Sequence, residues 1–165
     1  MMFIVHRALL FTHVLFAFLY MLTHGASVAV AHRMRRENSV ERIRALLDLS
    51  WSTVTVGYYL LLVLLLSGVT LGFLGHWWHA RWIWASLGIL VALIVFMAVV
   101  AAAHFHKIRA AVGLPTIGGT AHPTGVSAAP EEVARVILAG HPRVVATIGV
   151  VGWAAILWMM LFKPG

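Results

Sequence analysis

Four apolar segments, each about as long as a bilayer is thick, dominate this sequence. They cover roughly residues 3–31, 51–74, 82–104 and 144–162. A transmembrane helix needs about 20 predominantly apolar residues, and all four segments meet that length. The chain of 165 residues is 62% hydrophobic and only 10% charged, more apolar surface than a water-soluble domain of this size could bury. The sequence therefore predicts an all-α, four-helix transmembrane bundle that forms a single integral membrane domain, residues 1–165.

The charged stretch between the first two spans is itself periodic. Val40, Ile43 and Leu47 fall on one side of a helix over residues 38–48, with charged residues around the rest. This pattern predicts either a short interfacial helix or an extension of the second span. Asn38 and Glu41 have the spacing of a capping box, which places the start of this helix at Asn38.

The other connections differ in length and composition. Residues 75–81 are a short link, so the second and third spans are expected to form an antiparallel pair, with an aromatic belt at the water interface formed by Trp77, Trp78, Trp82 and Trp84. Residues 110–130 form a linker rich in Gly, Pro, Thr and Ser. Residues 131–139 are a short amphipathic piece, and Pro142 is suited to the first turn of the fourth span.

Lysine and arginine are distributed unequally between the two sides that this topology creates. Three of them, Arg7, Arg81 and Lys163, lie on one side. The other nine lie on the opposite side: Arg33, Arg35, Arg36, Arg42, Arg44, Lys107, Arg109, Arg135 and Arg143. The positive-inside rule makes the second side cytoplasmic and places both termini on the extracytoplasmic side. We therefore expect a multi-pass protein of a bacterial cytoplasmic membrane.

The basic residues also indicate which partners to expect. They stand at the ends of apolar runs, where anionic lipid headgroups are their natural partners. They are not interleaved with aromatic residues on a polar face, so the net charge of +7 does not indicate nucleic-acid binding. The expected partner is the lipid bilayer, together with a larger respiratory or other membrane complex or a second copy of the chain.

Ten histidines are the unusual feature of so apolar a chain. In the first span, His6, His13 and His24 are 7 and 11 residues apart, and both offsets are within about 20° of whole helical turns. The three side chains therefore share one stripe. His104 is expected near the level of His24, and His79 near the level of His13, which predicts one histidine cluster towards each face of the membrane.

This layout suits haem b, because the iron in a helical bundle takes axial nitrogen ligands from two helices. An inner site would use His24 and His104, and an outer site His13 with His79. His13, His24 and His104 are also the candidate ligands for a bare metal ion. The alternative for these histidines is a simple hydrogen bond between helices.

Several other chemistries find no support in the sequence. The chain has no cysteine, which excludes thiolate metal sites and covalently attached haem. No acidic residue falls inside a predicted span, so there is no midplane carboxylate for a proton relay or an ion-driven transporter. The seven methionines form no ladder for copper, and Met21 and Met97 are isolated.

A resemblance to a known family rests on the end of the first span and the residues after it. His24-Gly25-Ala26-Ser27, then Arg33-Met34-Arg35-Arg36-Glu37 and Glu41-Arg42-Ile43-Arg44-Ala45-Leu46-Leu47, resemble uncharacterised bacterial four-helix membrane proteins grouped with the CopD-like copper-resistance family. The resemblance covers about the first third of the chain. It implies copper entry or, as in related bundles, b-type haem.

Three hypotheses follow from the sequence. The first is an electron-transfer protein that binds one or two b-type haems through histidines. The second is a structural or assembly subunit without a cofactor, which the small-residue pairs Gly68/Gly72 and Gly149/Gly152 would suit. The third is a CopD-like copper transport helper. All three favour an electron carrier or accessory subunit over an independent enzyme.

Overall fold

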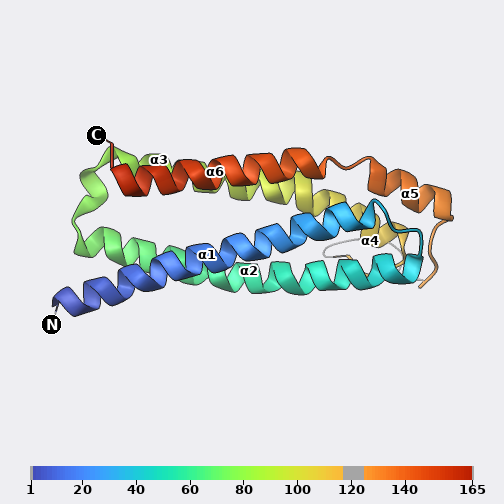
Figure 1. Ribbon diagram of the computed structural model, residues 1–165, viewed down its shortest axis with the longest axis horizontal. Helices are drawn as coiled ribbons and strands as arrows, with labels where there is room; N and C mark the ends of the chain where they lie inside the picture. Colours follow the sequence, from blue (N-terminus) through green and yellow to red (C-terminus); the bar gives the residue numbers. More distant parts are fainter. Residues whose placement is uncertain (1, 117–124, 165) are drawn as a thin grey trace.

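A computed structural model describes residues 2–116 and 125–164, and the regular structure of these residues is helical, with no strand among them. Four helical rods cross the length of the molecule (Figure 1). They are formed by α1 (Met2–Met34), α2 (Val40–Leu74), α3 (Arg81–Phe96) continued by η2 (Met97–Ala102) and α4 (Ala103–Ala111), and α6 (Pro142–Phe162). The short elements are η1 (Trp77–His79) and α5 (Pro130–Leu138). Each predicted span lies within one rod, so the predicted fold is confirmed.

The stretch before the second span is an extension of that span. α2 is continuous over 35 residues, and its start at Val40 includes the periodic segment. Ser39, not Asn38, is the N-cap, because its Oγ accepts a hydrogen bond from the backbone N–H of Arg42 at 3.5 Å. The prediction of a cap at Asn38 is therefore wrong by one residue. Part of the predicted linker 110–130, residues 117–124, lies outside the described residues.

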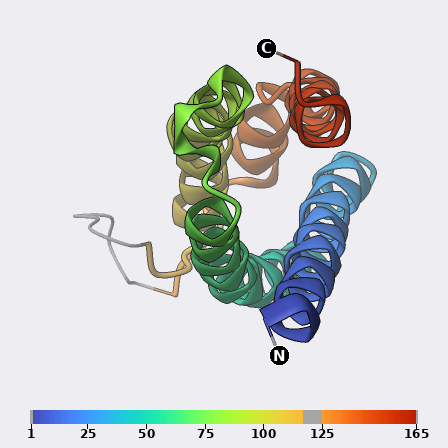
Figure 2. The ribbon, with the colours of Figure 1, turned by 90° about the vertical axis from the view of Figure 1, so that its left-hand side faces the viewer.

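The rods form two pairs. α1 packs along α2, and α3 packs along α6, while α1 also contacts α6 between the pairs. Figure 2, seen from the end that carries both termini, shows the four rods side by side in this arrangement. α2 and α3 run antiparallel as predicted, but each has its main contacts with another helix. Below, the end with the termini and η1 is the tryptophan end, and the end with α4 and α5 is the arginine end.

The outer faces of the rods are apolar and exposed. Large side chains such as Phe18 (64% exposed), Leu62 (54%), Val99 (66%) and Leu157 (62%) point away from the bundle. Four helices of the described chain are long and apolar enough to cross a membrane. Lipid tails can cover such faces, whereas the backbone polar groups are satisfied within each helix. These features are those of a multi-pass membrane protein.

A compact hydrophobic core lies at the arginine end. The amphipathic helix α5 buries Val133 and Ile137 in it, and α5 begins with Pro130 at its first position, one residue before the predicted amphipathic piece 131–139. The remaining buried members come from the end of α1, the start of α2 and the end of α4: Val30, Met34, Ile43, Leu47, Ile108 and Val112. This cluster joins the two helix pairs outside the longest apolar stretches.

Arginine side chains complete the arginine end by binding carbonyl oxygens at helix ends. Arg44 donates from Nε to Val112 O at 2.9 Å, and Arg35 donates from Nη1 to Gly140 O at 2.8 Å. The last carbonyls of a helix have no partner within the helix, and cations near them are favourable. The buried Arg109 guanidinium lies 3.1 Å from the Asp48 carboxylate and 5.1 Å from the centre of the Trp51 ring.

Aromatic rings close the tryptophan end. Trp77 and Trp82 lie 5.7 Å apart between ring centres, and Lys163 Nζ lies 4.3 Å from the centre of Trp77. His6 of α1 meets the same Trp77 ring edge-on at 6.2 Å. The predicted aromatic belt therefore also ties α1, η1 and the end of α6 together.

Replacement of Leu47 by Ala should destabilise the arginine-end core, because Leu47 is 1% exposed. Loss of a buried leucine side chain costs about 2–5 kcal/mol in unfolding free energy. Leu62→Ala on the same helix is the matched control, since Leu62 is 54% exposed. Unfolding in mixed detergent micelles measures both. Equal losses for the two variants would contradict a core confined to the arginine end.

Candidate intramembrane metal site

The three predicted intramembrane ligands share one packing arrangement, a histidine ring against a glycine of a neighbouring element. His13 of α1 lies against Gly68 of α2, where an added Cβ would be 2.8 Å from Cε1 of the ring. His24 lies against Gly149 of α6, and a Cβ there would overlap its Nε2. His104 lies against Gly140 in the same way, just before α6. The glycines therefore make room for the rings.

His13 forms a hydrogen bond between α1 and α2. Its Nδ1 lies 3.1 Å from Leu64 O and 3.1 Å from Ser67 Oγ, and Ser67 Oγ in turn donates to Leu64 O at 2.9 Å. A carbonyl only accepts, so Nδ1 carries the proton and donates to Leu64 O. Nε2 of His13 is then the unprotonated nitrogen of the ring.

The histidines predicted to act in pairs, His13 with His79 and His24 with His104, lie at different places in the bundle. His79 is exposed on η1 at the tryptophan end. His104 faces Gly140, whose carbonyl accepts the bond from Arg35. His24 faces Gly149, nine residues further along the chain. In residues 2–116 and 125–164, no three His, Asp or Glu side chains come together in a way that could hold a metal ion.

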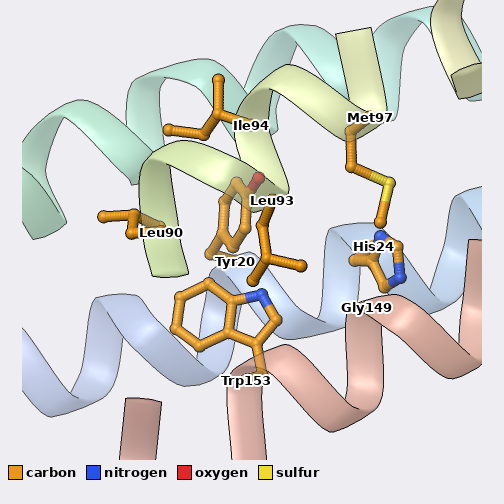
Figure 3. A pocket seen from close by; sticks show the side chains of 8 residues that line it. All are labelled: Tyr20, His24, Leu90, Leu93, Ile94, Met97, Gly149 and Trp153. Carbon is orange, nitrogen blue, oxygen red and sulfur yellow. The ribbon is translucent and has the colours of Figure 1, made fainter. Parts of the chain in front are cut away.

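His24 lines a narrow crevice between α1, α3 and α6 (Figure 3). The crevice contains about 280 Å³ of space, including its open side, and its lining is Tyr20, His24, Leu90, Leu93, Ile94, Met97, Gly149 and Trp153. Nε2 of His24 is buried and has no hydrogen-bond partner among the described residues. A buried nitrogen without a partner costs about 1–3 kcal/mol, so its retention calls for an explanation.

Met97 is the crevice residue that sequence reasoning missed. Figure 3 shows its side chain extending from η2 toward the His24 ring on the facing helix α1. Met97 is the first residue of the π-helical segment η2, and such segments occur often at functional sites. In the sequence Met97 is one apolar residue within an apolar run, with no signal that separates it from lipid-facing neighbours.

Aromatic and aliphatic side chains form the rest of the crevice. The rings of Tyr20 and Trp153 lie 5.3 Å apart between their centres and wall it on the side away from Met97 (Figure 3). Leu90, Leu93 and Ile94 of α3 line the remainder. The crevice therefore offers an imidazole nitrogen and a thioether sulfur from two different helices as metal donors, beside the Tyr20 hydroxyl and the Trp153 N–H.

This donor pair suits two kinds of metal centre to different degrees. Histidine and methionine together are axial ligands of haem iron in cytochromes. A haem, however, needs space for its macrocycle, and the side chains that line the crevice leave it narrow. His24 is also packed directly on the α6 backbone at Gly149. A single soft cation needs no such space, and thioether and imidazole ligands both suit copper.

Comparison of the chain with protein-family models, with curated proteins and with solved structures finds no match. The side chains of the crevice are therefore the basis for assigning a function.

Replacement of Gly149 by Ala should push the His24 ring out of its place, because the new Cβ would overlap Nε2. Overpacking of this kind costs about 1–3 kcal/mol. Unfolding in mixed micelles should show this loss of stability in the wild-type background and little of it in a His24→Ala background. The two substitutions should therefore be coupled by about 1 kcal/mol or more in unfolding free energy.

Gly88→Ala is the control for helix propensity, since a Cβ at Gly88 meets nothing within 4 Å. It should be neutral or slightly stabilising. An equal cost of Gly149→Ala with and without the His24 ring would show that the ring does not depend on this glycine.

Proposed function

We propose that this protein binds Cu(I) within the membrane through His24 and Met97 and serves as a copper transport helper. The observation that carries the proposal is the buried Nε2 of His24, which has no partner among the described residues and shares its crevice with the Met97 thioether. Coordination of a soft cation gives both atoms a partner. An ionisable side chain inside a membrane is a functional candidate by default, which supports this assignment.

The ligand chemistry favours the reduced, singly charged ion. A neutral imidazole and a thioether bring no negative charge, so the complex keeps the charge of the metal, and a low charge reduces the cost of placing it in an apolar environment. Thioether sulfur is a soft ligand that selects Cu(I). No residue that lines the crevice is acidic, so ions that prefer carboxylate ligands have no such ligand there.

The resemblance of the first third of the chain to CopD-like proteins supports the same assignment, since it implies a role in copper entry. The rings of Tyr20 and Trp153 wall the crevice beside these donors, 5.3 Å apart between their centres. A site of this kind would hold an ion on its way between the two faces of a membrane.

Anaerobic titration of the detergent-purified full chain with Cu(I), in competition with a chromophoric Cu(I) chelator, tests this function. We expect one Cu(I) per chain. Met97→Leu preserves volume and removes the sulfur, and it should weaken binding by about tenfold or more, equivalent to about 1.4 kcal/mol.

Met160→Leu is the matched control, because Met160 lies outside the crevice near the end of α6 and is 37% exposed. Its affinity should equal that of the unmodified chain. Binding that falls equally in both leucine variants, or that is unchanged in Met97→Leu, would reject Met97 as a ligand.

A b-type haem for electron transfer is the second candidate. His13 supports it, because the bond from Nδ1 to Leu64 O leaves Nε2 as a lone-pair donor, the tautomer that a metal-bound histidine adopts. The His24–Met97 pair would supply two donors to the iron, provided that α1 and η2, which carry these residues, separate enough to admit a macrocycle. Reduced α and Soret bands in the purified protein would establish haem. A colourless sample without bound iron or copper would favour the remaining hypothesis, a structural or assembly subunit without a cofactor.

A further inference from the structure

A second feature, distant from the crevice, is a groove on the outer surface of the arginine end. It runs between the end of α1 and the start of α2, and its lining is Arg33, Glu37, Arg42, Ala45, Leu46 and Leu49. The groove contains about 570 Å³ of space, including its open side. Its lining combines the charged residues before Ala45 with the apolar residues Ala45, Leu46 and Leu49, and Leu49 is 57% exposed.

The two arginines of the groove differ from the other arginines that hold this end together. Arg35, Arg44 and Arg109 donate hydrogen bonds to carbonyl or carboxylate oxygens of the chain. Arg33 and Arg42 have highly exposed side chains, 64% and 72%, and make no such bond within the described residues. Their guanidinium groups are thus available to an external anion.

Glu37 lies between these arginines without occupying their donors. Its carboxylate is 3.9 Å from Arg33 and 3.7 Å from Arg42, longer than the hydrogen-bond range of about 2.7–3.2 Å. It accepts hydrogen bonds from the backbone N–H groups of Asn38 and Ser39. The N–H of Ser39 above all, with that of Asn38 and the guanidinium groups of Arg42 and Arg33, holds the pKa of the Glu37 carboxyl below its ordinary value. The groove therefore presents two cations around one fixed anion, a net positive charge.

The position of the groove relative to the bilayer matches one class of ligand. Arg42 and Leu49 are seven residues apart on α2, about 10 Å along the helix axis. The groove therefore descends from the charged end of the bundle toward the apolar part of α2. An anionic phospholipid has this same order of groups, a phosphate in the headgroup layer and acyl chains below it.

We propose that this groove binds an anionic phospholipid, with its phosphate between Arg33 and Arg42 and an acyl chain against Leu46 and Leu49. Arginine forks match phosphate oxygens in geometry, and basic pockets beside transmembrane helices bind anionic headgroups. The site orders one lipid at the junction of α1 and α2, where the chain turns at the arginine end.

Native mass spectrometry of the full chain, released from nanodiscs that contain equal amounts of phosphatidylglycerol and phosphatidylcholine with the same acyl chains, tests the site. The unmodified chain should retain phosphatidylglycerol preferentially. In the double variant Arg33→Gln/Arg42→Gln, the preference for phosphatidylglycerol over phosphatidylcholine should fall by about 10- to 30-fold. This is the usual contribution of two arginines near an anionic membrane surface.

The double variant Arg36→Gln/Arg143→Gln is the control, because it removes the same charge from exposed residues of the same end that do not line the groove. It should retain phosphatidylglycerol as the unmodified chain does. Equal losses of phosphatidylglycerol in both double variants would show that general attraction between charges retains the lipid, and would overturn the proposal of a site in the groove. Equal retention of the two lipids by the unmodified chain, or displacement of the lipid by millimolar inorganic phosphate alone, would also overturn the proposal.

Discussion

Helices in a bilayer gain little by burying apolar side chains against one another, since lipid is equally apolar, so their association depends on close approach and on polar contacts. In this protein histidine rings packed on glycines give the close approach, and the His13 ring adds a polar contact with Leu64 O. His13 on Gly68 joins α1 to α2, His24 on Gly149 joins α1 to α6, and the third ring, His104, meets Gly140 where α5 leads into α6. α1 therefore connects the two helix pairs, and the core at the arginine end holds them in register.

The same packing creates the candidate site. Gly149 admits the His24 ring deep between α1 and α6, where Nε2 loses contact with water and finds no partner among the described residues. On the facing rod, the π-helical segment η2 begins at Met97, and the thioether reaches the same crevice. His13, by contrast, satisfies its Nδ1 on Leu64 O and acts first as a connection between helices. The two rings share a stripe of α1 but have different neighbours.

Much of the fold was predictable, because an apolar run of about 20 residues leaves few alternatives to a spanning helix. Helical periodicity also located His13 and His24 on one face of α1. Periodicity could not show that this face meets α2 at one level and α6 at another, since that depends on how the rods cross. Met97 could not be recognised, because neither the π-helical segment nor the crevice has a signature in an apolar run. The N-cap prediction failed by one residue because Asn38 and Ser39 are both good caps, and only the backbone path selects Ser39.

The central claim is that one nitrogen and one sulfur from facing helices hold a soft metal ion inside the membrane. X-ray absorption at the copper edge of the Cu(I)-loaded full chain tests it most directly, because the first coordination shell distinguishes sulfur from nitrogen. The account predicts a shell with both an imidazole nitrogen and a sulfur, and loss of the sulfur contribution in Met97→Leu but not in Met160→Leu. A shell of nitrogen and oxygen alone, or a sulfur contribution that persists in Met97→Leu, would contradict it.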